Sequence, residues 1–260
     1  MHNPSHLNPT GRFSGLAEIY ARCRPRYSDA ALDYIMSRCQ LRPGSVLVDV
    51  GCGTGISSRP FAARGVRVIG VEPNDDMRRQ AEVEPVPGGC PAPEYRPGRA
   101  EATGLPAGIA DAVLAAQAFH WFDMTASLRE FGRVLKPAGR VVVLWNERDP
   151  NDPFTAAYGT VIHSSPDAAA VELPRWRVGD ALMVHPLFPG GEKVEFPNEQ
   201  ELDEDGMLGR AFSASYAPRE PAAAAKFAAA LRAAFARFQQ GGKVVMRYRT
   251  TVFFGGRAPD

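Results

Sequence analysis

Two acidic residues and a short run of glycines stand where the sequence could hold a small ligand. Asp49 lies near the end of an apolar, β-branched run, and Glu72 follows the next such run along the chain. The glycines alternate with other residues directly after the first run: Gly51, Gly53 and Gly55. Glycine adopts positive φ and lets the backbone approach a ligand, so the pattern predicts a tight turn free of side chains. The helix expected at 56–63 would direct its first N–H groups into the same crevice.

The residues that are missing indicate which ligand fits. Ile56 stands where the dinucleotide fingerprint has its third glycine, and no Gly-Lys-Ser/Thr ending marks a P-loop. Asp49 would repel a phosphate but suits an ammonium group or hydroxyls. Glu72 follows at roughly the 20-residue interval at which an acid binds a ribose diol. A nucleoside that carries an amino acid fits both carboxylates, although a glycine turn can be plain connection geometry and either acid could cap a helix or pair with an arginine.

Residues 48–55 resemble the glycine loop of the class I S-adenosylmethionine-dependent methyltransferases, and residues 71–77 resemble their ribose-binding strand end. The resemblance implies S-adenosylmethionine as the cofactor and a small molecule as the methyl acceptor. The residues expected at the cofactor are Tyr20, Arg24, Asp49, Gly51, Gly53, Gly55, Glu72, Pro73, Met77, Ala100, Glu101 and Gln117.

Some of these positions also fit a purely structural role. Tyr20 and Arg24 belong to an aromatic, basic segment, 13–27, which either covers the cofactor as a lid or packs over the core. Met77 either lies beside the adenine or fills the core. Glu101 lies in a loop in which an acid found in many relatives is replaced here by an arginine. It therefore either reaches the adenine edge or is a solvated loop acid.

An aromatic turn, 117–123, follows the strand expected at 110–117. In a doubly wound sheet the carboxyl ends of the strands border the ligand crevice, so this turn should meet the methionyl part of the cofactor and the substrate. His120 is the candidate general base, and the alternative is a histidine packed among aromatic rings. A small-molecule subgroup of the methyltransferases has a very similar turn, which supports a position near the site. Trp121 is a candidate substrate contact.

Strands and helices alternate from Ser45 to Trp145, which predicts a parallel sheet with right-handed crossovers. We expect an α/β fold with a doubly wound, mostly parallel seven-stranded sheet, Rossmann-like as in the methyltransferases. Its fifth strand is expected at 140–145. Residues 193–196 and 244–254 would supply a terminal antiparallel hairpin.

This expected fold divides the chain into three segments. Residues 1–44 would form an N-terminal lid and the first helices, and residues 45–145 the S-adenosylmethionine-binding core. Residues 146–260 would hold a substrate-covering insertion and, in the same domain, a C-terminal helix at 221–240 and the antiparallel strands. We expect a helix at 153–162 and, because of its prolines, short pieces after it.

Cations and aromatic residues combine in this last segment and could seat an anionic or aromatic substrate. The candidate contacts are Arg175, Arg210 and Tyr216. Solvated arginines and core aromatics would explain them as well. The acidic cluster at 201–205 fits a helix start or a solvated face better than a metal site, and no metal is expected.

The composition excludes several kinds of partner. The chain has 260 residues and a net charge of +1 from 30 basic and 29 acidic residues, so no overall field gathers nucleic acid or an anionic membrane. Its 4 cysteines show no C-x-x-C pairing, and no apolar run approaches the roughly 20 residues of a membrane span. We therefore expect one cytoplasmic domain with additions, acting as a monomer or homodimer.

The leading hypothesis is methyl transfer to a small-molecule acceptor at oxygen, either a carboxylate or a hydroxyl. C- or N-methylation of a small metabolite is one alternative. A nicotinamide oxidoreductase is another, against which Asp49 and the missing third glycine both argue. A non-catalytic protein that retains the nucleoside pocket is the third.

Overall fold

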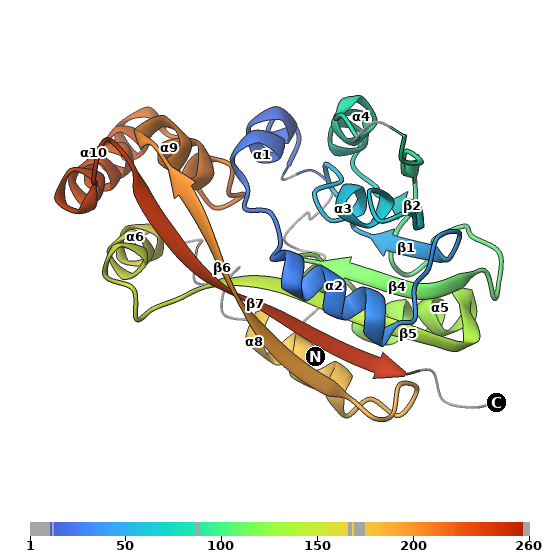
Figure 1. The fold of residues 1–260 in the computed structure, drawn as a ribbon. Helices are drawn as coiled ribbons and strands as arrows, with labels where there is room; N and C mark the ends of the chain where they lie inside the picture. Colours follow the sequence, from blue (N-terminus) through green and yellow to red (C-terminus); the bar gives the residue numbers. More distant parts are fainter. Residues whose placement is uncertain (1–10, 12, 87–88, 166–167, 169–174, 257–260) are drawn as a thin grey trace.

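The computed structural model describes residues 11–256 apart from 12, 87–88, 166–167 and 169–174 (Figure 1). Within these residues, strands β1 to β7 form one mixed sheet in the order β3-β2-β1-β4-β5-β7-β6. The strands are β1 (Val46–Val50), β2 (Arg67–Val71), β3 (Glu94–Arg96), β4 (Ala110–Ala116), β5 (Leu135–Arg148), β6 (Glu192–Leu202) and β7 (Val244–Gly256). The predicted seven-stranded, Rossmann-like sheet with a terminal antiparallel pair is confirmed.

The parallel half, from β3 to β5, carries the predicted glycine strand at its centre. β1 pairs with β2 on one side and β4 on the other, and its four last residues are buried. A strand that is covered on both faces must be apolar throughout, which explains its unbroken run of valine and leucine up to Asp49.

Helices cover both faces of this sheet. Leu32 and Ile35 of α2 and Phe61 of α3 pack on one face, while Leu128 and Phe131 of α5 pack on the other. The described helices are α1 (Ala17–Cys23), α2 (Asp29–Arg38), α3 (Ser58–Ala62), α4 (Asp75–Val83), the 3₁₀ turn η2 (Phe119–Trp121), α5 (Met124–Val134), α6 (Pro153–His163), α8 (Arg175–Met183), α9 (Glu204–Phe212) and α10 (Pro221–Phe238).

The antiparallel strands extend past the parallel half and carry a second layer of helices at one end of the molecule (Figure 1). There α6, α9 and α10 pack on β7 around a separate apolar core. This core includes Tyr158, Met207, Leu231 and Met246. This helical end lies beside α1, because α1 and α9 are in contact. The N-terminal helix thus lies between the helical end and α4, which it also contacts.

Several elements differ in extent from the sequence-based expectation. β5 continues to Arg148 instead of ending at Trp145. β6 spans Glu192–Leu202 and includes Pro197, which an edge strand tolerates because its N–H side needs no partner. The helix after the glycine loop begins only at Ser58. The predicted helices at 153–162 and 221–240 are present as α6 and α10.

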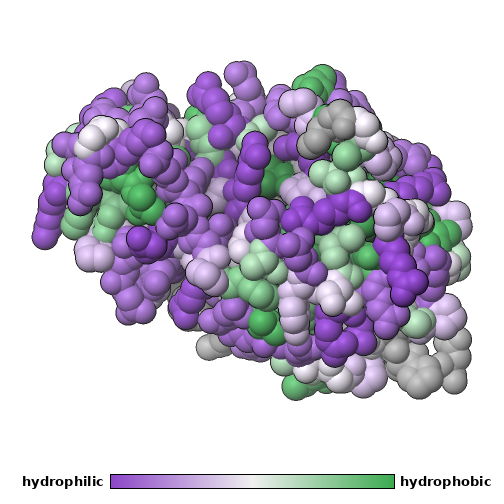
Figure 2. Space-filling model, in the orientation of Figure 1, coloured by the Kyte–Doolittle hydropathy of each residue, from purple (hydrophilic) through white to green (hydrophobic). Residues whose placement is uncertain are grey.

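The visible surface is mainly hydrophilic, with small and separate hydrophobic areas (Figure 2). All four cysteines are free thiols. Among the described residues, no helix combines the length and apolar character needed to cross a bilayer.

Candidate functional site

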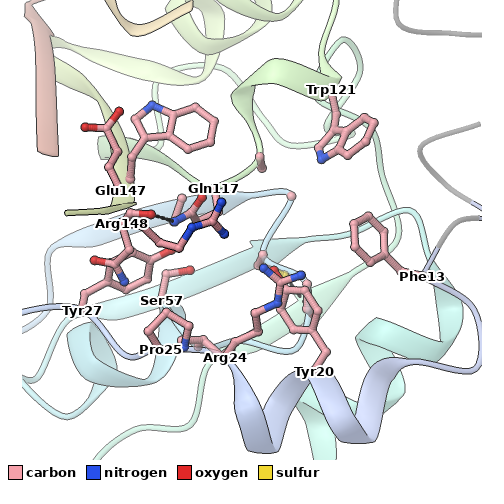
Figure 3. Close-up of a pocket in the computed structure, with 18 of the residues that line it drawn as sticks. Phe13, Tyr20, Arg24, Pro25, Tyr27, Ser57, Gln117, Trp121, Glu147 and Arg148 are labelled. Carbon is pink, nitrogen blue, oxygen red and sulfur yellow. Dashed lines mark hydrogen bonds between the residues drawn. The ribbon is translucent and has the colours of Figure 1, made fainter. Parts of the chain in front are cut away.

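A cavity of about 640 Å³ lies at the carboxyl ends of the parallel strands (Figure 3). Such a volume is typical of small-molecule and cofactor sites. Trp121 and Arg210 line it, and so do most of the residues expected at the cofactor: Tyr20, Arg24, Gly51, Gly53, Glu72, Pro73, Met77, Ala100, Glu101 and Gln117. Segments that are far apart in sequence therefore meet at one site.

Four other candidate residues lie outside the described part of the cavity wall: Asp49, Gly55, His120 and Tyr216. Tyr216 is buried in the core of the helical end, where its carbonyl accepts a hydrogen bond from the Ser165 hydroxyl at 2.8 Å. Arg175 begins α8, and its side chain lies outside the described residues.

The glycine loop has the backbone that its sequence predicts. The φ angles of Gly51, Gly53 and Gly55 are 69°, 56° and 74°. Gly51 and Gly53 line the cavity, whereas a side chain at Gly55 would collide with the Tyr95 hydroxyl. The third glycine thus makes room for Tyr95, which is a packing role that the sequence pattern alone does not separate from ligand contact.

Glu72 is anchored by backbone N–H groups at the end of β2. Its Oε2 accepts a hydrogen bond from the Gly53 N–H at 2.9 Å, and its Oε1 accepts one from the Asn74 N–H at 2.8 Å. The side chain lines the cavity although the residue is only 8% exposed. Burial raises the pKa of Glu72. The two N–H groups fix both carboxylate oxygens, whose remaining lone pairs are available to a ligand.

Asp49 is fully buried behind the glycine loop. Its Oδ2 accepts hydrogen bonds from the Ser57 and Ser58 hydroxyls at 2.7 and 2.6 Å. Its Oδ1 has no hydrogen-bond partner among the described residues. Burial raises the pKa of Asp49 to about 6, against the two hydroxyl hydrogen bonds, which lower it. Ser57 lines the cavity, so the carboxylate adjoins the site through this side chain.

The raised pKa of Asp49 predicts a pH-dependent stability. Because its pKa is 3.8 ordinarily and about 6 in the fold, the folded chain binds the proton more tightly, and the free energy of unfolding falls as the pH rises from about 4 to about 6. The shift corresponds to at most about 3 kcal/mol. Urea unfolding of the wild type and Asp49→Asn should show a difference that changes by up to this amount across that window and is constant above it. A difference that stays flat across the window would contradict the prediction.

The N-terminal segment lies over the cavity. Phe13 packs edge-to-face against both Tyr20 and Trp121, with ring centroids 5.8 and 6.1 Å apart (Figure 3). The Arg24 guanidinium lies 4.5 Å from the centre of the Tyr20 ring and donates a hydrogen bond to the Ser213 carbonyl at 3.1 Å. The segment thus joins the glycine-loop side of the cavity to the helical end.

The aromatic turn after β4 closes another side of the cavity. Gln117 has a φ of 57°, which is uncommon for a residue other than glycine, and its side chain donates a hydrogen bond to the Asn146 carbonyl at 3.1 Å. The His120 ring lies 4.5 Å from that of Trp121 and 5.3 Å from that of Trp145. His120 therefore supports two aromatic rings of the cavity wall.

Glu101 combines a cavity position with a structural contact. Its Oε1 accepts a hydrogen bond from the Asp123 N–H at 2.9 Å, and its Oε2 lies 3.8 Å from the Arg99 guanidinium. Asp123 in turn caps α5 by accepting a hydrogen bond from the Ala126 N–H. Glu101 thus ties the loop before β4 to the aromatic turn.

The opposite end of the cavity contains residues that sequence reasoning missed. They are Tyr27, Trp145, Asn146, Glu147, Arg148, Asp149, several residues of α6 and Arg249. Those at 145–149 lie at the carboxyl end of β5, and the same strand-end rule that identified the aromatic turn would have found them had β5 been expected to continue past Trp145. The face of α6 that meets the cavity has no such signal, because periodicity does not say which neighbour a helix contacts.

Within the described residues, no cluster of histidine, cysteine and acidic side chains could hold a metal ion. The cavity wall instead combines Glu72 and Glu101 near the glycine loop with a mixed set of charges at the other end, where the cations Arg148, Arg210 and Arg249 accompany the acids Glu147 and Asp149.

Residues 48–143 match a family model described as a methyltransferase domain. An uncharacterized methyltransferase of Mycobacterium tuberculosis is 32% identical over 150 residues, which are 58% of each chain. The matched region thus spans little more than half the length of that relative. Nocamycin O-methyltransferase of Saccharothrix syringae is 28% identical over 208 residues, which are 74% of each chain.

A solved structure from Anaeromyxobacter dehalogenans, provisionally described as a type II methyltransferase, superimposes with a TM-score of 0.64 at 28% identity. The superposition covers 91% of the present chain and 99% of that one. The likeness therefore includes the helical end as well as the glycine-loop half.

Proposed function

We propose that this chain, which belongs to the class I S-adenosylmethionine-dependent methyltransferases, transfers a methyl group to an oxygen of a small-molecule acceptor. The observation that carries the proposal is one cavity with two chemically different ends. The glycine loop and Glu72 form an end suited to an adenosyl group, and β5, α6 and α9 form an end that leaves room for a second molecule. Two matched relatives, a nocamycin and a ubiquinone-biosynthesis enzyme, are O-methyltransferases, which favours oxygen as the acceptor atom.

The residues fit the cofactor in three ways. A Cβ at Gly53 would enter the cavity beside Met77, whose Cε lies 3.4 Å from that position, so the loop leaves space for a ligand. Glu72 presents two fixed carboxylate oxygens, which suit the two hydroxyls of a ribose. The buried Asp49 adjoins the cavity through Ser57 and supplies negative charge for an ammonium group.

When bound, S-adenosylmethionine supplies an electrophilic methyl group whose sulfonium charge disappears on transfer. The chain must then hold the acceptor oxygen in line with that group and keep water out. Tyr20, Trp121 and Trp145 provide apolar walls for this purpose. Alignment of two bound reactants contributes perhaps ~7–11 kcal/mol in favourable cases, so positioning alone supplies much of the rate.

Whether a general base is required depends on the acceptor. A carboxylate is ionised at neutral pH and needs orientation only, whereas a hydroxyl would require a base such as His120. Because the His120 ring packs against both Trp121 and Trp145 and lies outside the described part of the cavity wall, we expect His120→Phe to retain kcat within about threefold. General-base catalysis is typically worth about 10²- to 10⁴-fold, so a loss of that size in steady-state kinetics would make His120 the base.

Transfer of a tritiated methyl group tests the proposed function. The protein and methyl-labelled S-adenosylmethionine are incubated with a panel of small carboxylic acids, alcohols, phenols and amines, and labelled product is extracted. Label on an acid or a hydroxyl compound supports O-methylation, and label confined to amines or to carbon contradicts it. Tight cofactor binding with no transfer to any compound of the panel would favour a non-catalytic nucleoside-binding protein.

A further inference from the structure

Arg210 is a buried cation on the cavity wall. It lies on α9 and is only 6% exposed. Among the described residues, its Nε and Nη1 have no hydrogen-bond partner, and no carboxylate forms an ion pair with it. Its electrostatic neighbours are the neutral hydroxyl groups of Tyr248, Tyr158 and Tyr216. A buried charge without a counter-charge is unfavourable unless a ligand supplies one.

Contacts of the end of α9 fix the backbone that carries this guanidinium. The Ser213 hydroxyl donates a hydrogen bond to the Arg210 carbonyl at 2.8 Å, and Arg24 donates one to the Ser213 carbonyl. Gly209 packs against α1, where an added Cβ would lie 2.5 Å from the Cys23 sulfur. The backbone of Arg210 is thus held in place by its helix end and by the packing of the adjacent Gly209 on α1, and the residue lines the cavity from there.

The other two cations at this end of the cavity, Arg249 and Arg148, either contact another side chain or are exposed to solvent. Arg249 is exposed and lies 3.7 Å from the Glu195 carboxylate, and the Arg148 guanidinium lies 5.7 Å from the centre of the Tyr158 ring. Trp145, by contrast, has a buried Nε1 without a hydrogen-bond partner among the described residues. Arg210 and Trp145 therefore both line the same cavity, and both carry buried donors without a hydrogen-bond partner among the described residues.

Unused donors call for a ligand that brings acceptor oxygens and negative charge. Glu147 and Asp149 also line this end of the cavity, and their charge disfavours a dianion such as a phosphate monoester. The three arginines at this end, Arg148, Arg210 and Arg249, and these two acids leave one net positive charge, which a single negative charge balances. We propose that Arg210 binds a carboxylate of the methyl acceptor, with Trp145 as an additional donor at the same end. This assignment rests on the proposed methyl transfer and names the class of its acceptor.

The stability of a variant tests whether Arg210 awaits a ligand or holds the fold together. Arg210→Met replaces the charge with an apolar chain of similar length, and without ligand its midpoint of thermal unfolding should equal or exceed that of the wild type by about 2–4 °C. Arg232→Met is the control, since Arg232 is exposed and pairs with Glu204 at 3.0 Å, and it should change the midpoint by less than about 1 °C. A midpoint of Arg210→Met below that of the wild type would overturn the proposal.

Ligand binding supplies the second arm, measured with and without saturating S-adenosylhomocysteine. Benzoate should raise the unfolding midpoint of the wild type and of Arg232→Met, whereas benzamide should not. Arg210→Met should weaken benzoate binding by about 10- to 150-fold, as expected for a charge-assisted hydrogen bond. Equal responses to acid and amide, an unchanged response in Arg210→Met, no response to benzoate, or a stronger response to phenyl phosphate would each contradict a carboxylate site. Failure of S-adenosylhomocysteine alone to bind would instead contradict the proposed function.

Discussion

Replacement of Glu72 by alanine should weaken the binding of S-adenosylhomocysteine by about 10²- to 10⁴-fold. Two hydrogen bonds from ribose hydroxyls to a carboxylate are worth about 1.5–3 kcal/mol each, and every 1.4 kcal/mol is a tenfold change in affinity. The carboxylate is already oriented by the N–H groups of Gly53 and Asn74, so a ligand that binds it loses little by ordering it. Equilibrium dialysis with labelled ligand measures the change.

The control for this substitution is Glu82→Ala. Glu82 is exposed on α4, which directly follows the Glu72 loop, so the variant removes the same side chain without touching the cavity. Its affinity should stay within about twofold of the wild type, as expected for a distant surface substitution. If Glu72→Ala binds as tightly as Glu82→Ala, the ribose does not lie at Glu72.

Two alanine substitutions in the glycine loop should fail for different reasons. In Gly51→Ala the new Cβ would lie 2.7 Å from the Ala118 Cβ and 3.1 Å from the Phe122 ring, in addition to the strain of a φ of 69°. The crowding and strain together should lower the free energy of unfolding by about 2–4 kcal/mol. In Gly53→Ala the nearest atom is the flexible Met77 Cε at 3.4 Å, so the cost to stability should be only about 1–2 kcal/mol.

Relative to its loss of stability, Gly53→Ala should lose more cofactor affinity than Gly51→Ala. The methyl group of Gly53→Ala occupies the space left for the cofactor, so the variant should stay folded and lose at least about tenfold in S-adenosylhomocysteine affinity. Gly108→Ala measures the cost of backbone strain alone, because Gly108 has a φ of 67° and an added Cβ would have no atom within 4 Å. It should lose about 1–2 kcal/mol of stability and no affinity. Wild-type affinity in Gly53→Ala would remove this loop from the cofactor site.

The parallel half of the fold could be predicted because its signals are local. A buried central strand must be apolar on both faces, so the runs before Asp49 and Glu72 indicate strands without reference to the rest of the chain. β6 was harder to predict, because Pro197 suggested a break, and only the position of the strand at the sheet edge makes a proline acceptable there.

The two ends of the cavity also differ in how far the sequence predicts them. The cofactor end depends on a short turn and on one acid after the next strand, and both leave a recognisable spacing in the sequence. The other end is assembled from Tyr27, the end of β5, one face of α6, a single residue of α9 and Arg249 of β7. No spacing links these segments, since tertiary packing alone brings them together. Arg210 could be proposed as a substrate contact from its residue type, but its burial without a counter-charge appears only in the folded chain.

His120 illustrates the limit of residue type as a guide to mechanism. Its position in the aromatic turn makes it the natural candidate base, whereas its ring is packed against two tryptophans that themselves line the cavity. The turn lines the cavity, as expected where strand ends border the ligand crevice in this kind of sheet. The direction of one side chain within a turn depends on its neighbours, and the sequence does not specify those.

Calorimetric titration of the wild-type protein tests the central claim, that the cavity beside Gly51, Gly53 and Glu72 holds an adenosyl amino acid. S-adenosylhomocysteine should bind with one molecule per chain and a measurable heat, and NAD should give none. Saturable binding of NAD with no heat from S-adenosylhomocysteine would contradict the claim and favour a nicotinamide oxidoreductase.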